Sequence, residues 1–257
     1  MDPYAALAPA YDAMTASYDY DRWLTTIERV ADGFRPRART VLDVACGTGS
    51  SFLPLCDRGC EVTACDVSEA MLDRARARLG TRRARLVRAD MRRLPRLGSF
   101  DLVLCLDDAI NHLLTGADVT AALVGAAANL APAGVFVFDV NTLATIREGF
   151  SSEWRHEDDD VRIVWRGRSP ADLASGARAE AQVEILRRPT GDRRTTVLRE
   201  RHHPLDEVRE RLAAVGLTPV AVFGQQENVR LRPEADDLRH RKALFFAMRT
   251  GGDVSRR

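Results

Sequence analysis

The sequence predicts an α/β fold, with a doubly wound, mostly parallel sheet and an antiparallel β insertion. Two observations carry this prediction. Short apolar runs alternate with amphipathic segments, which is the pattern of strand–helix–strand units. The first run leads directly into Gly47 and Gly49, as at a tight strand-to-helix turn. With 257 residues, 45% of them hydrophobic, the chain can bury one large core, and we expect a single domain.

The parallel part of the sheet is expected before residue 142. Its five strands are expected at residues 40–45, 60–68, 84–91, 99–106 and 134–141. The run over 99–106 is nearly all apolar, as a strand buried on both faces is. Helices are expected directly after Gly49, over 68–79 with Ser68 as N-cap, and over 117–132, where Pro132 ends the helix.

The pattern changes at residues 151–203. Shorter alternating strands are expected over 161–168, 177–188 and 193–203, with a hairpin turn at 189–192. We expect this segment to form a small antiparallel lid over the core.

The two ends of the chain complete the predicted core. A helix over 204–217 begins at Pro204 and ends at Gly216. The last two strands are expected at 218–224 and 242–249, and a disordered tail is expected at 250–257. One or two helices are expected over residues 4–33.

Composition narrows the class of protein. The net charge of +1 creates no field that would attract nucleic acid. No apolar run approaches the roughly 20 residues that span a bilayer, and the N-terminus lacks the basic start of a secretory signal. The five cysteines form no Cys-x-x-Cys pair, which favours reduced thiols in a cytoplasm. Lys242 is the only lysine, and all other Lys or Arg positions are arginine. We attribute this bias toward arginine to codon usage.

The glycines allow three interpretations. A dinucleotide fingerprint needs a third glycine where this chain has Phe52, and a phosphate-binding P-loop needs a Gly-Lys-Ser/Thr sequence that the chain lacks. A turn without a ligand is the third interpretation. Against it, Asp66 and Asp90 end the second and third strands, at the edge where parallel strands bind ligands. A carboxylate there can accept both hydroxyls of a ribose or an exocyclic amino proton.

The stretches VLDVACGTGS, VTACDVSEAMLDRARARL and LVRADMRRLP resemble the class I S-adenosylmethionine-dependent methyltransferases. This resemblance implies a Rossmann-like sheet of seven strands in the order 3-2-1-4-5-7-6, with the last strand antiparallel. It also implies cap helices over 1–36, a cofactor-binding core over 37–150, the insertion over 151–203 and the rest of the core over 204–249.

The resemblance implies cofactor contacts at matched positions, with S-adenosylmethionine as the only cofactor and no metal. These positions are Tyr11, Trp23, Asp43, Ala45, Cys46, Gly47, Gly49, Asp66, Val67, Met71, Ala89, Asp90, Met91 and Leu106.

A closer resemblance involves the stretches YDAMTASYDYDRW, CLDDAINHL and FDVNT. They are similar to segments of a small-molecule branch that includes the lincosamide N-methyltransferases. The resemblance implies that substrate residues include Tyr20, Asp107, Asn111, Asn141 and His203.

Catalysis is assigned to Asp108, His112 and Tyr11. His112 could be a general base or a hydrogen-bonded histidine of a short helix, and Asp108 could hold a substrate cation or cap that helix. His202 and His203 are a weak metal pair, because neighbours in a strand point to opposite faces.

The function expected from these residues is methyl transfer to a nitrogen, or less favourably an oxygen, of a small specialised metabolite. Two alternatives remain open: an RNA or protein methyltransferase, and a protein that binds the cofactor without turnover. The expected partner is a small-molecule acceptor, with neither membrane nor nucleic acid, and a homo-oligomer is compatible with the sequence.

Overall fold

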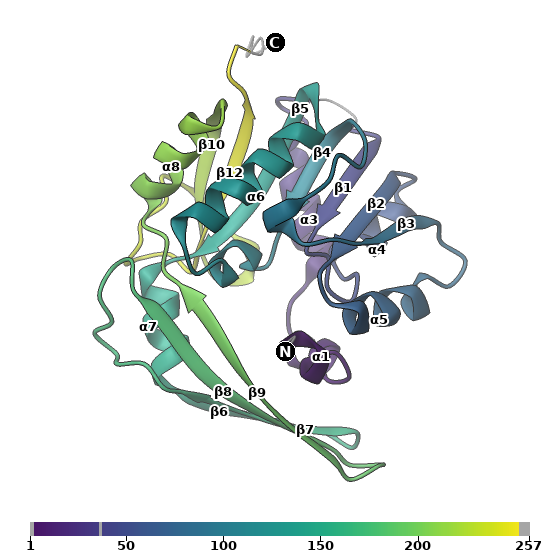
Figure 1. Ribbon diagram of the computed structural model, residues 1–257, viewed down its shortest axis with the longest axis vertical. Helices are drawn as coiled ribbons and strands as arrows, with labels where there is room; N and C mark the ends of the chain where they lie inside the picture. Colours follow the sequence, from purple (N-terminus) through teal and green to yellow (C-terminus); the bar gives the residue numbers. More distant parts are fainter. Residues whose placement is uncertain (1–2, 36–37, 252–257) are drawn as a thin grey trace.

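The computed structural model describes residues 3–35 and 38–251. The central sheet has eight strands in the order β11-β10-β12-β5-β4-β1-β2-β3 (Figure 1). Strands β1 to β5 are parallel, and β12 is antiparallel to both β5 and β10. The bounds are β1 Thr40–Val44, β2 Glu61–Asp66, β3 Ala84–Arg88, β4 Phe100–Cys105, β5 Leu130–Asn141, β10 Leu217–Gln225, β11 Leu231–Pro233 and β12 Lys242–Arg249.

The expected strand order is confirmed, but the predicted count of seven strands is wrong. The additional strand is β11, a three-residue edge strand that pairs with β10. It is too short to show an alternating pattern and it ends in Pro233, a residue that sheets tolerate at their edges.

Helices cover both faces of the central sheet (Figure 1). The core on one face includes residues from α6 and α8, and the core on the other face includes residues from α3, α4 and α5. The bounds are α3 Tyr20–Ala31, α4 Leu53–Asp57, α5 Glu69–Leu79, α6 Gly116–Asn129 and α8 Leu205–Ala214. Helix α6 ends before Pro132, because Leu130 already begins β5.

The insertion forms a second, antiparallel sheet in the order β6-β7-β8-β9. Figure 1 shows it beside the central sheet, next to α7 Leu143–Ser151. Its strands are β6 Glu153–Glu157, β7 Val161–Gly167, β8 Arg178–Arg187 and β9 Asp192–Arg201. The sequence predicted three of these four strands. The strand β6 was missed because its polar residues are half-buried at best.

The N-terminal segment contains three helices rather than the expected one or two: α1 Pro3–Leu7, α2 Tyr11–Met14 and α3. Asp19 separates the last two, since its side chain accepts a hydrogen bond from the Arg22 backbone N–H at 3.0 Å and caps α3. Helix α1 lies between β9 and α5, so it joins the second sheet to the central domain (Figure 1).

The remaining expectations concern the tail and the thiols. Residues 252–257 of the predicted tail lie outside the described residues. All five cysteines are free thiols. Between residues 3 and 251, apart from 36–37, none of the helices has the length and apolar character to cross a membrane.

Candidate active site

A cavity of ≈ 740 Å³ opens where β1, β2 and β4 end. Its wall combines the glycine loop after β1, the residues following β2 and β4, the N-terminal helices α1 and α2, and part of the second sheet. This volume lies within the range of small-molecule sites. The cavity therefore occupies the edge of the parallel sheet at which the sequence predicted a ligand.

The glycine loop brings backbone to the cavity wall. Ala45, Gly47 and Gly49 have φ angles of 59°, 53° and 95°, which is the left-handed region that favours glycine. A Cβ at Gly49 would lie 2.9 Å from the Phe52 ring, so close packing against Phe52 requires a glycine here. Gly47 lines the cavity.

Asp66, at the end of β2, anchors this loop. Its carboxylate accepts hydrogen bonds from the Gly47 N–H at 2.9 Å and from the Ser68 N–H at 2.8 Å. Asp66 lines the cavity together with Val67 and Met71. A carboxylate accepts hydrogen bonds, so its position suits the two hydroxyls of a ribose as donors.

Asp90 and Met91 lie beside this group and also line the cavity. Asp90 forms an ion pair with Arg92 at 2.5 Å, and hydrogen bonds from this guanidinium lower the pKa of Asp90. The carboxylate stays ionised and can accept a hydrogen bond from an amino group.

Replacing Asp66 with Ala should weaken the binding of S-adenosylhomocysteine by about 2–3 kcal/mol, because a charge-assisted hydrogen bond is lost. Calorimetry measures the change, and Asp66→Asn keeps the size of the side chain as a control. Unchanged affinity in both variants would remove the assignment.

Four predicted cofactor residues lie outside the cavity wall. Asp43 is buried behind the loop, where the Ser51 hydroxyl donates to it at 2.5 Å and burial raises its pKa to about 7. Trp23 is fully buried against Tyr18. Asp43 can support the glycine loop and Trp23 the N-terminal helices, but neither residue lines the cavity. The four are Trp23, Asp43, Gly49 and Ala89.

Two consecutive residues after β4 have left-handed backbone conformations: Asp107 at φ 62° and Asp108 at φ 56°. Such residues cost on the order of 1–3 kcal/mol each unless their surroundings hold them. The Asp139 carboxylate provides this support, since it accepts hydrogen bonds from the Asp107 N–H at 2.6 Å and the Asp108 N–H at 2.9 Å. Both side chains line the cavity.

Lys242, at the start of β12, neutralises part of this group. Its ammonium donates to Asp139 at 2.9 Å and to Asp107 at 3.0 Å, and it lies 3.8 Å from Asp108. Burial lowers the pKa of Lys242, but the neighbouring carboxylates reverse this effect and raise it. Nothing in the local sequence predicts this role, although Lys242 is the only lysine among 38 lysines and arginines.

Two tyrosines connect the N-terminal helices to Asp107. The Tyr20 hydroxyl donates to Asp107 at 2.7 Å, and the Tyr11 hydroxyl donates at 3.4 Å. Both line the cavity, as predicted, and burial raises the pKa of each. Burial alone would raise the pKa of Asp107, but Lys242 and the hydrogen bond from Tyr20 lower it below its ordinary value.

Asp108 faces Glu200, a residue of β9 that the sequence analysis did not select. The Asn141 amide nitrogen donates to both carboxyl groups, at 2.7 and 2.9 Å. Burial raises the pKa of Asp108 and raises that of Glu200 to about 7. The alternation of buried Thr196, Leu198 and Glu200 in β9 could have identified this inward-facing acid.

His112 completes the group around these two acids. Its Nδ1 lies 3.0 Å from the Arg199 backbone carbonyl, which only accepts hydrogen bonds, so Nδ1 donates and the neutral ring keeps a lone pair on Nε2. The Tyr4 ring packs edge-on against it, with the centroids 5.4 Å apart. One ligand atom from each of Asp108, His112 and Glu200 lies within 4.8 Å of the others, a spacing that could hold a cation.

Three predicted substrate residues do not line the cavity: Asn111, Asn141 and His203. Asn111 is buried and donates to the Arg201 carbonyl at 3.0 Å, while its own oxygen accepts from the Asn141 backbone N–H at 2.8 Å. His203 is also buried and does not line the cavity. These residues fix Asn141 and the end of β9 in place.

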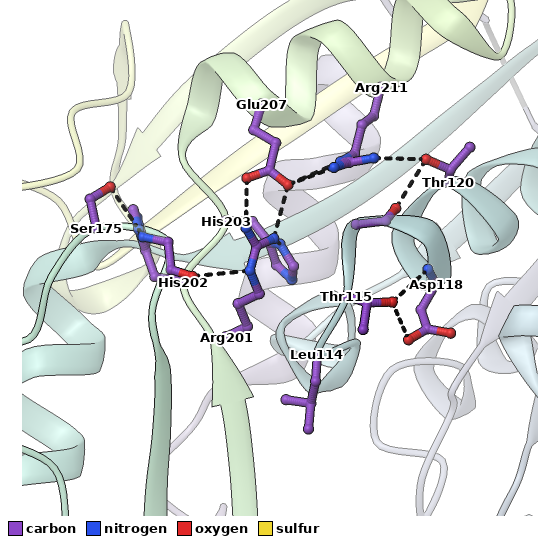
Figure 2. A network of polar contacts seen from close by, with 12 residues as sticks. Leu114, Thr115, Asp118, Thr120, Ser175, Arg201, His202, His203, Glu207 and Arg211 are labelled. Atoms are coloured by element: carbon purple, nitrogen blue, oxygen red, sulfur yellow. Dashed lines mark hydrogen bonds and ion pairs between the residues drawn. The ribbon is translucent and has the colours of Figure 1, made fainter.

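Figure 2 shows how the end of β9 is attached to α8. Arg201 forms a double ion pair with Glu207 at 2.9 Å and donates to His203 Nδ1 at 2.8 Å. Burial, followed by the Arg201 charge, lowers the pKa of His203 to about 4. The network holds Glu200, one residue before Arg201, at a fixed place in the cavity.

Comparison with known proteins gives the family. A methyltransferase domain model matches residues 41–134. The chain is 30% identical over 216 residues to the putative methyltransferase YqeM of Bacillus subtilis, covering 83% of this chain and 85% of that protein. It is also 36% identical over 121 residues to a dTDP-3-amino-3,6-dideoxy-α-D-glucopyranose N,N-dimethyltransferase of Streptomyces fradiae, covering 47% of each.

The solved structures agree. The S-adenosylmethionine-bound amino pentose methyltransferase CalS10 of Micromonospora echinaspora aligns with a TM-score of 0.71 and 26% identity over 93% of this chain and 96% of that one. An S-adenosylmethionine-dependent methyltransferase of Clostridium acetobutylicum aligns with a TM-score of 0.79 and 22% identity over 96% of this chain and 99% of that one. The chain belongs to the S-adenosylmethionine-dependent methyltransferases.

Proposed function

We propose that this enzyme methylates an amine nitrogen of a small specialised metabolite. The carrying observation is the carboxyl pair Asp108 and Glu200, bridged by Asn141 at the cavity wall. Lys242, the nearby cation, already donates to Asp107 and Asp139. The pair therefore lacks a full counter-charge, and an ammonium group would supply it.

The cofactor would lie along the wall between the glycine loop and β3. Asp66 would hold its ribose, Val67 and Met71 would contact the adenine, and Asp90 would accept a hydrogen bond from the adenine amino group. S-adenosylmethionine supplies an electrophilic methyl group on a sulfonium. The backbone around Gly47 would lie against its methionyl part, together with Ala45 and Cys46. The resemblance to lincosamide N-methyltransferases stays a prediction.

The residues of the wall would align and deprotonate the acceptor. Alignment alone can account for roughly 7–11 kcal/mol in favourable cases, so a neutral amine needs little further help. The carboxylates Asp108 and Glu200 would hold the arriving ammonium, and Glu200, with its pKa near 7, can take the proton that must leave. With Glu200 protonated, the Asp108 carboxylate would stabilise the positive charge that develops on nitrogen as it accepts the methyl group.

A hydroxyl acceptor is the second candidate, and His112 favours it, because the lone pair on Nε2 could serve as a base. His112→Ala separates the two. If the acceptor is an amine, the turnover of His112→Ala should stay within about tenfold of that of the unaltered enzyme. If the acceptor is a hydroxyl, turnover should fall by roughly 10²–10⁴-fold. Single-turnover rates across an amine series should follow each acceptor's own pKa. A profile that stays fixed for every acceptor and disappears in His112→Ala would establish the hydroxyl acceptor.

The spacing of Asp108, His112 and Glu200 also fits a divalent cation, which makes metal removal a decisive experiment. We expect methyl transfer to continue at an unchanged rate after dialysis against EDTA, since an ammonium and not a metal would occupy the three groups. A loss of activity that zinc, magnesium or manganese restores would assign the group to a metal.

A further inference from the structure

The charge of the cavity wall points to a class of acceptor. We propose that the site accepts amines that carry no anionic group, and that it rejects amino acids and phosphate-bearing acceptors such as nucleotide-linked amino sugars. This inference rests on the proposed N-methylation and adds to it a rule of selection.

Acidic side chains dominate the half of the wall around the acceptor. Asp107, Asp108, Asp118 and Glu200 all line the cavity. Asp139 lies directly behind, fully buried, and Lys242 faces these acids with a single positive charge. Glu200 is only 4% exposed, so water screens its charge poorly. An anionic group placed here would gain no attraction from Asp108 and Glu200 and would favour their protonated forms, whereas an ammonium would favour their ionised forms.

The cationic side chains of the wall are already engaged. Arg92 is paired with Asp90 at 2.5 Å, and Arg199 donates to Glu180 at 2.8 Å. His112 uses its Nδ1 on a backbone carbonyl. Among the described lining residues, therefore, no guanidinium lacks a carboxylate partner. A carboxylate or phosphate would have to share a guanidinium with Asp90 or Glu180, while an ammonium needs no such sharing.

The second sheet adds an aromatic surface to the same cavity. Trp154 and Trp165 stack with their centroids 5.8 Å apart and an interplanar angle of 12°, and both line the wall beside Val197 and Leu198. Aromatic faces attract cations and pack against apolar groups and the faces of sugar rings. The body of the acceptor is thus an uncharged ring or apolar group attached to the amine.

The test uses methyl-labelled S-adenosylmethionine and the small molecules of the cells that naturally make the protein. The extract is freed of protein and divided at pH 7 into fractions retained by a cation exchanger, retained by an anion exchanger, and unretained. We expect at least tenfold more label in acceptors of the cation-exchanger fraction. Nucleotide-linked sugars are retained by the anion exchanger, and zwitterionic amino acids stay unretained, so predominant labelling in either of those fractions would overturn the inference.

Two further outcomes separate this rule from the proposed function. Label in no fraction, with binding of S-adenosylhomocysteine intact by calorimetry, would refute small-molecule methylation itself and with it the rule. Label on oxygen in an uncharged acceptor would refute the amine. Glu200→Gln should reduce labelling of the cation-exchanger fraction at least tenfold. Glu184→Gln is the matched control, because it removes one negative charge in β8 outside the cavity wall. Its labelling of the same fraction should stay within twofold of that by the unaltered enzyme. Equal labelling by Glu200→Gln and the unaltered enzyme would overturn the rule.

Discussion

Asp108→Asn should lower kcat by about 10²–10³-fold while changing KM for the acceptor much less. The substitution leaves the size of the side chain unchanged and removes the charge opposite the nitrogen that becomes cationic during transfer. Losing one partner of a buried ion pair costs about 3–5 kcal/mol, and a loss of about 3–4 kcal/mol in the transition state corresponds to this change in rate.

Single-turnover measurements at saturating cofactor test this result. Binding of S-adenosylhomocysteine should stay within about twofold, because Asp108 lies at the acceptor side of the site. Asp118→Asn offers a matched control, since Asp118 lines the same cavity but bonds to Thr115 in the capping turn of α6. We expect a smaller effect there. Equal losses in both variants would show a general effect of charge and no specific role for Asp108.

Lys242→Met should destabilise the protein by about 3–5 kcal/mol at pH 8, because Asp107 and Asp139 would be buried without a counter-ion. The loss should depend on pH. Without Lys242, the folded-state pKa values of these carboxyls rise above their unfolded values. Such groups contribute stability below the unfolded pKa and lose it as pH rises through the folded pKa. The variant should therefore approach the unaltered protein near pH 5 and fall further behind toward pH 8.

Urea unfolding at several pH values measures this difference. Lys242→Arg keeps the charge and should recover part of the stability, although a planar guanidinium cannot reproduce the compact ammonium that contacts both Asp107 and Asp139. A destabilisation of Lys242→Met that is equal at pH 5 and pH 8 would assign the effect to lost packing against Trp23, whose ring centroid lies 5.5 Å from the ammonium.

Much of the central sheet could be predicted because its strands are long apolar runs. The apolar run over Phe100–Cys105 predicts a buried strand. The Gly-x-Gly turn, together with Asp66, predicts which edge of the sheet binds the cofactor. Strands β6 and β11 could not be predicted in the same way. The first is polar and half-buried at best, and the second has three residues, so neither shows the periodicity on which such predictions depend.

The acceptor side was only half predictable. Asp108 and His112 follow a predicted strand, and their place at the sheet edge follows from topology. The contact between Lys242 and Asp107 could not be predicted, because 135 positions separate them in the sequence. Glu200 belongs to β9, and local sequence does not determine where the second sheet packs against the core. The left-handed conformations of Asp107 and Asp108 depend on the Asp139 carboxylate, and therefore on tertiary contacts and not on their own sequence.

Glu200 and the aromatic pair both belong to the stretch from Glu153 to Arg201, whereas Asp66 and Gly47 belong to the central domain. One contiguous block of the gene thus encodes one side of the proposed acceptor site and none of the proposed ribose anchor. Recombination or mutation confined to that block could give a descendant a new acceptor while its use of the methyl donor stays intact. The same boundary is a natural place to join parts of two relatives when a biosynthetic enzyme is to be retargeted.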